Sequence, residues 1–336
     1  MLWGANVYGY SLEQRPTDPS MFTLLDLASH MEQDFGDVRD RDSLKQAMRK
    51  FQPELVIHMA AQPIVVEGFR DPQRTFETNI MGTVNLLELV RESESVSGVI
   101  IVTSDKCYRP SLDHAVAFSE GDPLGGDDPY SASKASQELV SQAYGRMLAM
   151  EGIGVATVRA GNVIGGGDWA TSRLVPDVIR SLRRSDVIFL RHPLHVRPWQ
   201  HVLEPLVGYL RVAERLLQHP GDYCGPWNFG PTERKTVQDV VDVIQQCWTR
   251  PMTVRASDDR NFYEMPSVIV DSRKAQRELG WTPVWDFATS VRMTVEWYER
   301  WMDGESSGQL LDFTINQIGT FVQDALRAHL AWAEGL

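Results

Sequence analysis

A tyrosine and a lysine stand four places apart in the segment YSASK, as Tyr130 and Lys134. On a helix this spacing is about one turn, so both side chains lie on the same face. A neighbouring ammonium favours phenolate over phenol, which lowers the pKa of the tyrosine toward that of a useful general base. This spacing often occurs by chance. Here, however, a GGDDP loop precedes it, and a strand-like run that is followed by the hydroxyl residue Ser104 lies upstream. This context predicts removal of a sugar or alcohol proton while hydride leaves carbon for a nicotinamide.

A second candidate group follows an apolar strand, in the consecutive residues Ser104, Asp105 and Lys106. An ordinary Ser-Asp turn with a solvated lysine accounts for these residues equally well. An acid and a base side by side are also what elimination of water from a carbon skeleton needs. One group removes the carbon-bound proton while the other protonates the leaving hydroxyl. The segment therefore indicates either a plain turn or an eliminating pair.

The elements that must position these residues alternate along the first half of the chain. Apolar strand-like runs cover 5–12, 54–62, 98–108 and 155–165, and helical spacing covers 42–51, 78–93 and 131–150. Continuous apolar strands joined by helices predict a doubly wound parallel sheet, the Rossmann-type α/β fold. Ligands of such sheets bind outside the carboxyl ends of the strands. Ser104 follows one of these ends.

The pattern changes after about residue 163. Two segments rich in Gly, Pro, Trp, His and Arg cover 165–182 and 189–205, and helical segments follow at 237–248, 271–281 and 313–336. We expect a Rossmann-type domain over 1–163 and mainly a smaller α/β substrate-binding lobe over 164–336. The strand-like run 222–231 is a candidate to return to the first domain. For the tail 313–336 we expect a packing role.

Composition excludes several classes of protein. The chain has 336 residues, 43% of them hydrophobic, and a formal net charge of −12 without a basic run. These features argue against binding to nucleic acid or to an anionic membrane. No apolar run approaches the ~20 residues of a membrane span, and we expect no signal peptide. Three widely spaced cysteines without a CxxC motif predict reduced thiols in a cytoplasmic protein, without a metal site.

Several motifs, in their order and spacing, carry a family resemblance. They are HMAAQP, TNIMGTVNLLE, TSDKCY, DPYSASK, RAGNVIGGGDW, RPWQHVLEP and WNFGP. They resemble the extended short-chain dehydrogenase/reductases, the NAD-dependent epimerase/dehydratase family, over nearly the whole chain. The GGGDW and RPWQHVLEP segments are similar to the CDP-sugar branch of the nucleotide-sugar 4,6-dehydratases. In the dTDP-sugar branch the strand-end motif usually carries Asp-Glu, whereas here it is Asp105-Lys106.

The resemblance implies conversion of CDP-glucose to CDP-4-dehydro-6-deoxyglucose and water, with NAD used and regenerated. Tyr130, assisted by Lys134 and Ser104, would deprotonate the 4-hydroxyl as hydride passes to NAD. The 4-ketone acidifies the proton on C5, which Lys106 would remove while Asp105 protonates the departing C6 hydroxyl. Hydride then returns to C6. A lysine can act as this base only if its pKa is lowered.

The resemblance also implies cofactor-binding residues. Ala60, Ala61 and Gln62 match residues that bind NAD, and the small alanines would let the cofactor approach the backbone. Tight packing between a strand and a helix would account for the alanines equally well. Asp37 and Val38 match an adenine contact; an Asp-rich turn is the alternative.

Five further positions match family residues. Asn79 matches a helix asparagine of the cofactor side that more often braces structure than touches substrate. On the substrate side the matches are Asn162, Arg173, Arg197 and His201. Arginines suit a diphosphate because a guanidinium binds oxyanions bidentately.

Two features depart from the family pattern. No Gly-x-x-Gly-x-x-Gly loop precedes the strand at 5–12, and residues 1–4 are typical of a helix end, so we expect a first βα unit to be missing. Either a start at an internal methionine or a true truncation accounts for this. A carboxylate after the second strand is expected to accept the ribose hydroxyls of NAD, and only Glu13 is available there. Arg15 nearby suits the 2′-phosphate of NADP instead. The expectation of NAD therefore rests mainly on the resemblance.

Two competing functions stay open at this point. An epimerase of the same fold shares Ser104, Tyr130 and Lys134 but has no use for the Asp105-Lys106 pair. A non-catalytic sugar-nucleotide-binding remnant is the other alternative, given the absent loop. The resemblance further implies a cytoplasmic homodimer and a place in deoxysugar assembly for surface polysaccharide such as lipopolysaccharide O-antigen.

Overall fold

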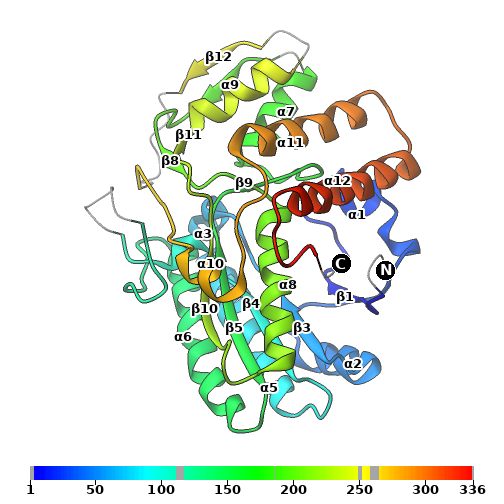
Figure 1. Ribbon diagram of the computed structural model, residues 1–336, viewed down its shortest axis with the longest axis vertical. Helices are drawn as coiled ribbons and strands as arrows, with labels where there is room; N and C mark the ends of the chain where they lie inside the picture. Colours follow the sequence, from blue (N-terminus) through cyan, green and yellow to red (C-terminus); the bar gives the residue numbers. More distant parts are fainter. Residues whose placement is uncertain (1–3, 111–116, 185, 249–251, 258–264, 335–336) are drawn as a thin grey trace.

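Four parallel strands form the central sheet of the protein, in the order β10–β5–β4–β3 (Figure 1). The computed structural model describes residues 4–110, 117–184, 186–248, 252–257 and 265–334. The strands of this sheet are β3 Leu55–His58, β4 Gly98–Val102, β5 Gly154–Ala160 and β10 Gly225–Phe229. The doubly wound α/β architecture predicted from the sequence is confirmed. The segment 222–231 contains β10, which pairs with β5 in this sheet and so supports its proposed return to the first domain.

The remaining elements alternate around this sheet. Up to residue 162 they are β1 Tyr8–Ser11, α1 Met21–Leu24, η1 Leu27–Ser29, β2 Glu32–Phe35, α2 Arg41–Phe51, α3 Val65–Arg70, α4 Pro72–Phe76, η2 Glu77–Met81, α5 Gly82–Arg91, η3 Asp105–Cys107 and α6 Pro129–Ala149. From residue 163 they are β6 Val163–Ile164, α7 Leu174–Arg184, β7 Ile188–Leu190, β8 Val196–Arg197, β9 Gln200–His201, α8 Leu203–Gln218, β11 Lys235–Thr236, α9 Val237–Cys247, β12 Val254–Ala256, α10 Arg273–Leu279, α11 Phe287–Met302 and α12 Ser307–Arg327.

Each face of the sheet packs against its own set of helices. Val99 and Ile101 on β4 belong to a cluster with residues of α2, α5 and α6. Ile100, which lies between them in sequence, belongs to a cluster with residues of α8, α10 and α12 on the opposite face. Successive side chains of a strand point to opposite faces. A strand covered on both faces is therefore apolar throughout.

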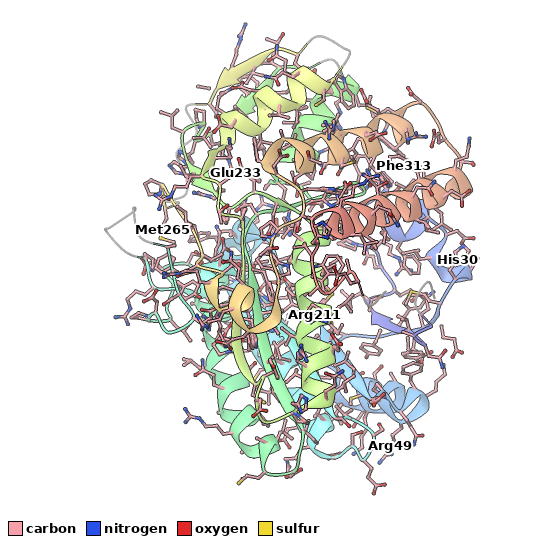
Figure 2. The ribbon with its side chains drawn as sticks, in the orientation of Figure 1. His30, Arg49, Arg211, Glu233, Met265 and Phe313 are labelled. Atoms are coloured by element: carbon pink, nitrogen blue, oxygen red, sulfur yellow. The ribbon has the colours of Figure 1, made fainter. Side chains whose placement is uncertain are left out.

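A second core lies in the other lobe, drawn at the top of Figure 1. Buried residues of α7, α9 and α11 form it, together with Leu310 of α12. Glu233, labelled in Figure 2, accepts a hydrogen bond from the backbone N–H of Phe287 at the start of α11 (2.9 Å). The far end of α12 contributes Phe321 to the cluster under the sheet, so this helix packs against both cores. The division at residues 163 and 164 stays a proposal, which these separate cores support.

The first strand lies apart from the central sheet. Within the described ranges β1 pairs only with β2, in parallel, and the two form a separate two-stranded sheet. Among the residues that the structure describes, β3 has β4 as its sole sheet neighbour. The strand expected over 5–12 is shorter, at Tyr8–Ser11. Of the helix end expected over residues 1–4, residues 1–3 lie outside the described part.

One predicted helix has an irregular start. The helical pattern over 78–93 begins as a π-helical turn, η2, before α5 continues it. Asn79 in this turn uses its side-chain amide to bond the backbone of Gln62 and the Ser133 hydroxyl. The π-helical turn therefore coincides with a side chain that is bonded both to the loop after β3 and to α6. No helix in the described ranges is both long enough and apolar enough to traverse a lipid bilayer.

Candidate active site

A cavity of about 820 Å³ opens at the carboxyl ends of β3, β4 and β5, between the sheet and the second lobe. Ligands of doubly wound sheets bind at this edge. The cavity is lined by all five residues predicted to carry chemistry: Ser104, Asp105, Lys106, Tyr130 and Lys134. Two segments that are separate in the sequence are thus brought to one place.

The strand-end segment turns as soon as β4 ends. Ser104 caps the short helix η3: its Oγ accepts a hydrogen bond from the Lys106 backbone N–H (3.2 Å). The same hydroxyl donates to Oδ1 of Asp105 (2.9 Å). Ser104 and Asp105 are buried, whereas Lys106 is half-buried at the cavity wall. The turn therefore presents a hydroxyl, a carboxyl and an ammonium on consecutive residues.

The start of α6 fixes the Tyr130–Lys134 pair. Asp128 caps the helix by accepting from the Ser131 backbone N–H (2.9 Å), and Pro129 is well suited to the first helical position. Lys134 is only 3% exposed, and its Nζ donates to the Val102 carbonyl (3.1 Å) and to Oε1 of Gln137 (2.9 Å). The ammonium is thereby tied to the end of β4.

Burial dominates the protonation of this pair. It raises the pKa of Tyr130 to about 12, although the hydrogen bond with Ser104 lowers the pKa of the phenol in part. The Lys134 ammonium, expected to lower the tyrosine pKa, is not among the main influences on this phenol: Ser104 and Arg173 lower the pKa, and burial outweighs them because taking phenolate out of water costs more. Burial also lowers the pKa of Lys134 to about 8, and the charge of Glu138 opposes this shift.

Asp105 differs from an ordinary surface carboxylate. It is 4% exposed, and burial raises the pKa of its carboxyl, while Lys106, Ser104 and Arg197 act in the opposite direction. A raised pKa favours the protonated acid. The group is consequently suited to giving a proton to a leaving hydroxyl.

The predicted binding residues divide between the cavity and its surroundings. Ala61, Asn162, Arg173 and Arg197 line the cavity. Arg173 is exposed and pairs with Asp168 (3.2 Å), whereas the buried Arg197 donates to the Val196 carbonyl (2.9 Å). Both arginines therefore border the cavity from the second lobe.

Other predicted residues lie outside the cavity lining. Ala60 and Gln62 are half-buried beside it, and Gln62 is braced by Asn79 as described above. Asp37 pairs with Arg39 (2.7 Å) at a separate shallow hollow of the surface. The Val38 side chain packs so closely on Gly82 that a Cβ there would lie 2.7 Å from Cγ2 of Val38.

His201 is the predicted substrate residue that the structure does not bring to the cavity. Its ring packs edge-on against Trp285 at 4.9 Å, and the side chain is buried. Burial lowers the pKa of this imidazole to about 3, so it is neutral at physiological pH.

The geometry also shows polar residues that were not predicted. His192 and His195 stack with ring centroids 4.3 Å apart on the cavity wall, and Nδ1 of His195 lies 3.2 Å from the Arg197 guanidinium. Behind the cavity, Glu138 forms a buried ion pair with Arg159. Glu138 lies four residues after Lys134, the same spacing that separates Tyr130 from Lys134. This repeated spacing is the feature of the sequence that could have pointed to Glu138. In the described part of the chain, no three His, Cys, Asp or Glu side chains gather as a metal site would require.

Comparison with known proteins decides the family. Residues 23–294 match the family model described as GDP-mannose 4,6 dehydratase. The chain belongs to that family. A CDP-glucose 4,6-dehydratase from Salmonella typhimurium is 41% identical to this family member over 310 residues, covering 90% of this chain and 86% of the relative.

More distant relatives include both dehydratases and epimerases. A UDP-glucose 4-epimerase from Rhizobium meliloti is 25% identical and covers 79% of this chain and 83% of its own. The structure of a dTDP-glucose 4,6-dehydratase from Streptomyces venezuelae, with NAD and TYD bound, matches with a TM-score of 0.70 and 27% identity over 80% of each chain. Relatives of this chain are thus named for two different reactions. The choice between these reactions for this chain must come from its cavity residues.

Proposed function

We propose that this family member is a CDP-glucose 4,6-dehydratase, which converts CDP-glucose to CDP-4-dehydro-6-deoxyglucose and water. The observation that carries the proposal is the Asp105–Lys106 pair in the same cavity as Ser104 and Tyr130. An epimerase has no step that needs an acid and a base beside C5 and C6. The 41% identity to the Salmonella typhimurium enzyme supports the choice of nucleotide sugar.

Tyr130 takes the proton of the 4-hydroxyl in the first stage. The Ser104 hydroxyl is hydrogen-bonded to the Tyr130 phenol, and this bond favours the phenolate that accepts the proton. The protonated Lys134, fixed by Val102 and Gln137, favours the phenolate form of Tyr130. Oxidation at C4 leaves a ketone that acidifies the hydrogen on C5.

Asp105 and Lys106 then carry the elimination. Lys106, acting in its uncharged amine form, removes the proton from C5, and the electron pair of that C–H bond forms the C5–C6 double bond as the C6–O bond breaks. Protonated Asp105 gives its proton to the departing hydroxyl, which leaves as water. Burial favours the protonated form of Asp105 before this step. The proton donor and the proton acceptor of the elimination are therefore consecutive residues.

The cavity also fits NAD, which the family implies. Among the described residues, Lys134 donates to two protein acceptors, and an ammonium has three donors, so the third is left for a ribose hydroxyl. The small side chain of Ala61 borders the same cavity as Lys134 and allows close approach to the backbone. When bound, NAD would supply the hydride acceptor for C4 and the hydride donor for C6.

The substrate diphosphate is assigned to the second lobe. Arg173 and Arg197 line the cavity from the second lobe, and Asn162, just after the end of β5, lines the same cavity. Two guanidiniums offer paired N–H donors to phosphate oxygens. An overall acidic chain can bind this anion because the positive charges are local.

We extend the proposal to assembly and setting. Leu139, Met147 and Met150 are exposed apolar residues on or just after α6. An apolar strip on a long surface helix supports a homodimer formed through this helix. Nucleotide sugars and NAD are cytoplasmic metabolites, which supports a cytoplasmic enzyme of deoxysugar assembly for surface polysaccharide such as lipopolysaccharide O-antigen.

The test is incubation of the purified chain with CDP-glucose and NAD, followed by mass spectrometry of the nucleotide sugar. We expect the mass to fall by one water, and UDP-glucose and dTDP-glucose to react more slowly. A product of unchanged mass with inverted C4 would establish the epimerase instead. Recovery of unchanged CDP-glucose would contradict the proposal.

A further inference from the structure

The catalytic segment Ser104–Lys106 is held at both ends by one buried ion pair. Thr103, just before the segment, donates from its hydroxyl to Oε1 of Glu138 (2.5 Å). Tyr108, two residues after the segment, has its hydroxyl 2.8 Å from Nη1 of Arg159, which donates to it. The two residues that flank the segment therefore bond to the two partners of the same pair.

The pair itself is rigid and fully buried. Nε of Arg159 donates to Oε1 of Glu138 (2.8 Å), and Nη2 donates to Oε2 (2.7 Å), so the contact is bidentate. Both side chains are completely inaccessible to solvent. Tyr108 passes the connection on by donating to Oδ1 of Asn228 on β10 (2.7 Å). The pair thus joins α6, β5 and β10 behind the cavity.

Glu138 belongs to the helix that carries the other catalytic residues. Tyr130, Lys134 and Glu138 follow one another at intervals of four on α6. Residues four apart are neighbours on a helix surface. The Glu138–Arg159 pair therefore connects the segment Ser104–Lys106 to the helix face that carries Tyr130 and Lys134.

We propose that Glu138 and Arg159 are positioning residues of the reaction, a clamp that holds Ser104–Lys106 in register with Tyr130 and Lys134. This inference rests on the proposed dehydratase function. Stability alone is a weak reason for such a pair, since buried ion pairs are often replaced by apolar residues at little cost or with a gain. The clamp acts through Thr103 and Tyr108 and touches no reacting atom.

The chain offers a matched pair of variants that avoids leaving a buried charge unpaired. Thr157 on β5 also donates to Glu138, from its hydroxyl to Oε2 (2.7 Å), and is as buried as Thr103. Thr103→Val and Thr157→Val therefore each remove one hydroxyl bond to the same carboxylate. Only Thr103 is attached to the catalytic segment.

In steady-state assays with CDP-glucose we expect Thr103→Val to lower kcat about tenfold or more with little change in KM, because a small misplacement of reacting groups costs this much. Thr157→Val should keep the wild-type kcat and show a similar loss of thermal stability. Thr103→Ser, which keeps the hydroxyl, should restore kcat. Equal kcat in the two valine variants would overturn the clamp.

Hydrogen exchange provides a readout that does not need turnover. The amides of Lys106 and Cys107 bond to Ser104 (3.2 Å each) and report the order of the segment. Faster exchange at these amides in Thr103→Val than in Thr157→Val supports the clamp, and equal exchange refutes it. If the wild type does not dehydrate CDP-glucose, the proposed function fails while this comparison still decides the clamp.

Discussion

Asp105 and Lys106 are neighbours in sequence but have different surroundings, and this difference supports the roles proposed for them. The carboxyl is buried against Ser104, and burial raises its pKa, so it is held ready as an acid. Lys106 is half-buried at the cavity wall. The two groups therefore fit donation to the leaving hydroxyl and removal of the C5 proton, respectively.

The variants Asp105→Asn and Lys106→Met test this assignment in deuterium oxide. Both should lower dehydration by about 10²–10⁴-fold, the usual contribution of an acid or base. Asp105→Asn should still wash solvent deuterium into C5 of the recovered CDP-glucose, because its base remains. Lys106→Met should not. The opposite pattern, measured by mass spectrometry, would exchange the two roles.

At the scale of elements, the N-terminus of α6 positions Tyr130, the proposed base of the first stage. Tyr130 is the second residue of the helix, directly after the Asp128 cap and Pro129. Fraying of the first turn would therefore move the phenol before any other catalytic group. The cap stabilises this turn by bonding the Ser131 N–H and hydroxyl.

We expect Asp128→Ala to lose about 1 kcal/mol of unfolding free energy, the typical value of an N-cap. It should also lower kcat, since the first turn frays with Tyr130 in it. Asp128→Ser is the matched control, because it loses the same charge but keeps a capping oxygen. Urea unfolding and kcat should place Asp128→Ser near the wild type in both properties. Equal kcat in the two variants would separate the cap from catalysis.

The sequence predicted elements well where local pattern decides them. The apolar runs of β3, β4 and β5 and the helical spacing of α2 and α6 predicted these elements to within a few residues at most ends. The strand-end position of Ser104 predicted its place at the cavity. The ion pair between Arg159 and Glu138 could not be predicted from the sequence, because it depends on how α6 packs against β5. The raised pKa of Tyr130 likewise follows from burial, which a single motif does not reveal.

For the whole molecule, three buried groups give stability an unusual dependence on pH. Burial lowers the pKa of His58 and His201 to about 3, and burial raises the pKa of Glu204 to about 7. Between about pH 4.5 and 6.5 the unfolded chain binds a proton on each histidine that the folded chain does not. The folded chain keeps one proton on Glu204 that the unfolded chain releases. Stability from the histidines is lost as pH falls, and stability from Glu204 is lost as pH rises.

The net difference from these groups is one proton, so together they should contribute a fall in unfolding free energy of about 1.4 kcal/mol for each unit of acidification. Glu204→Gln removes the opposing group and should steepen the measured slope by about 1.4 kcal/mol per unit. The amide oxygen that this substitution introduces can still accept from the Trp285 N–H, the partner of one Glu204 oxygen at 2.8 Å. Any lost bond shifts the free energy equally at each pH and leaves the slope alone. Urea unfolding at several values between about pH 5 and 6 measures both slopes, and parallel lines would show that Glu204 is ionised in the folded protein.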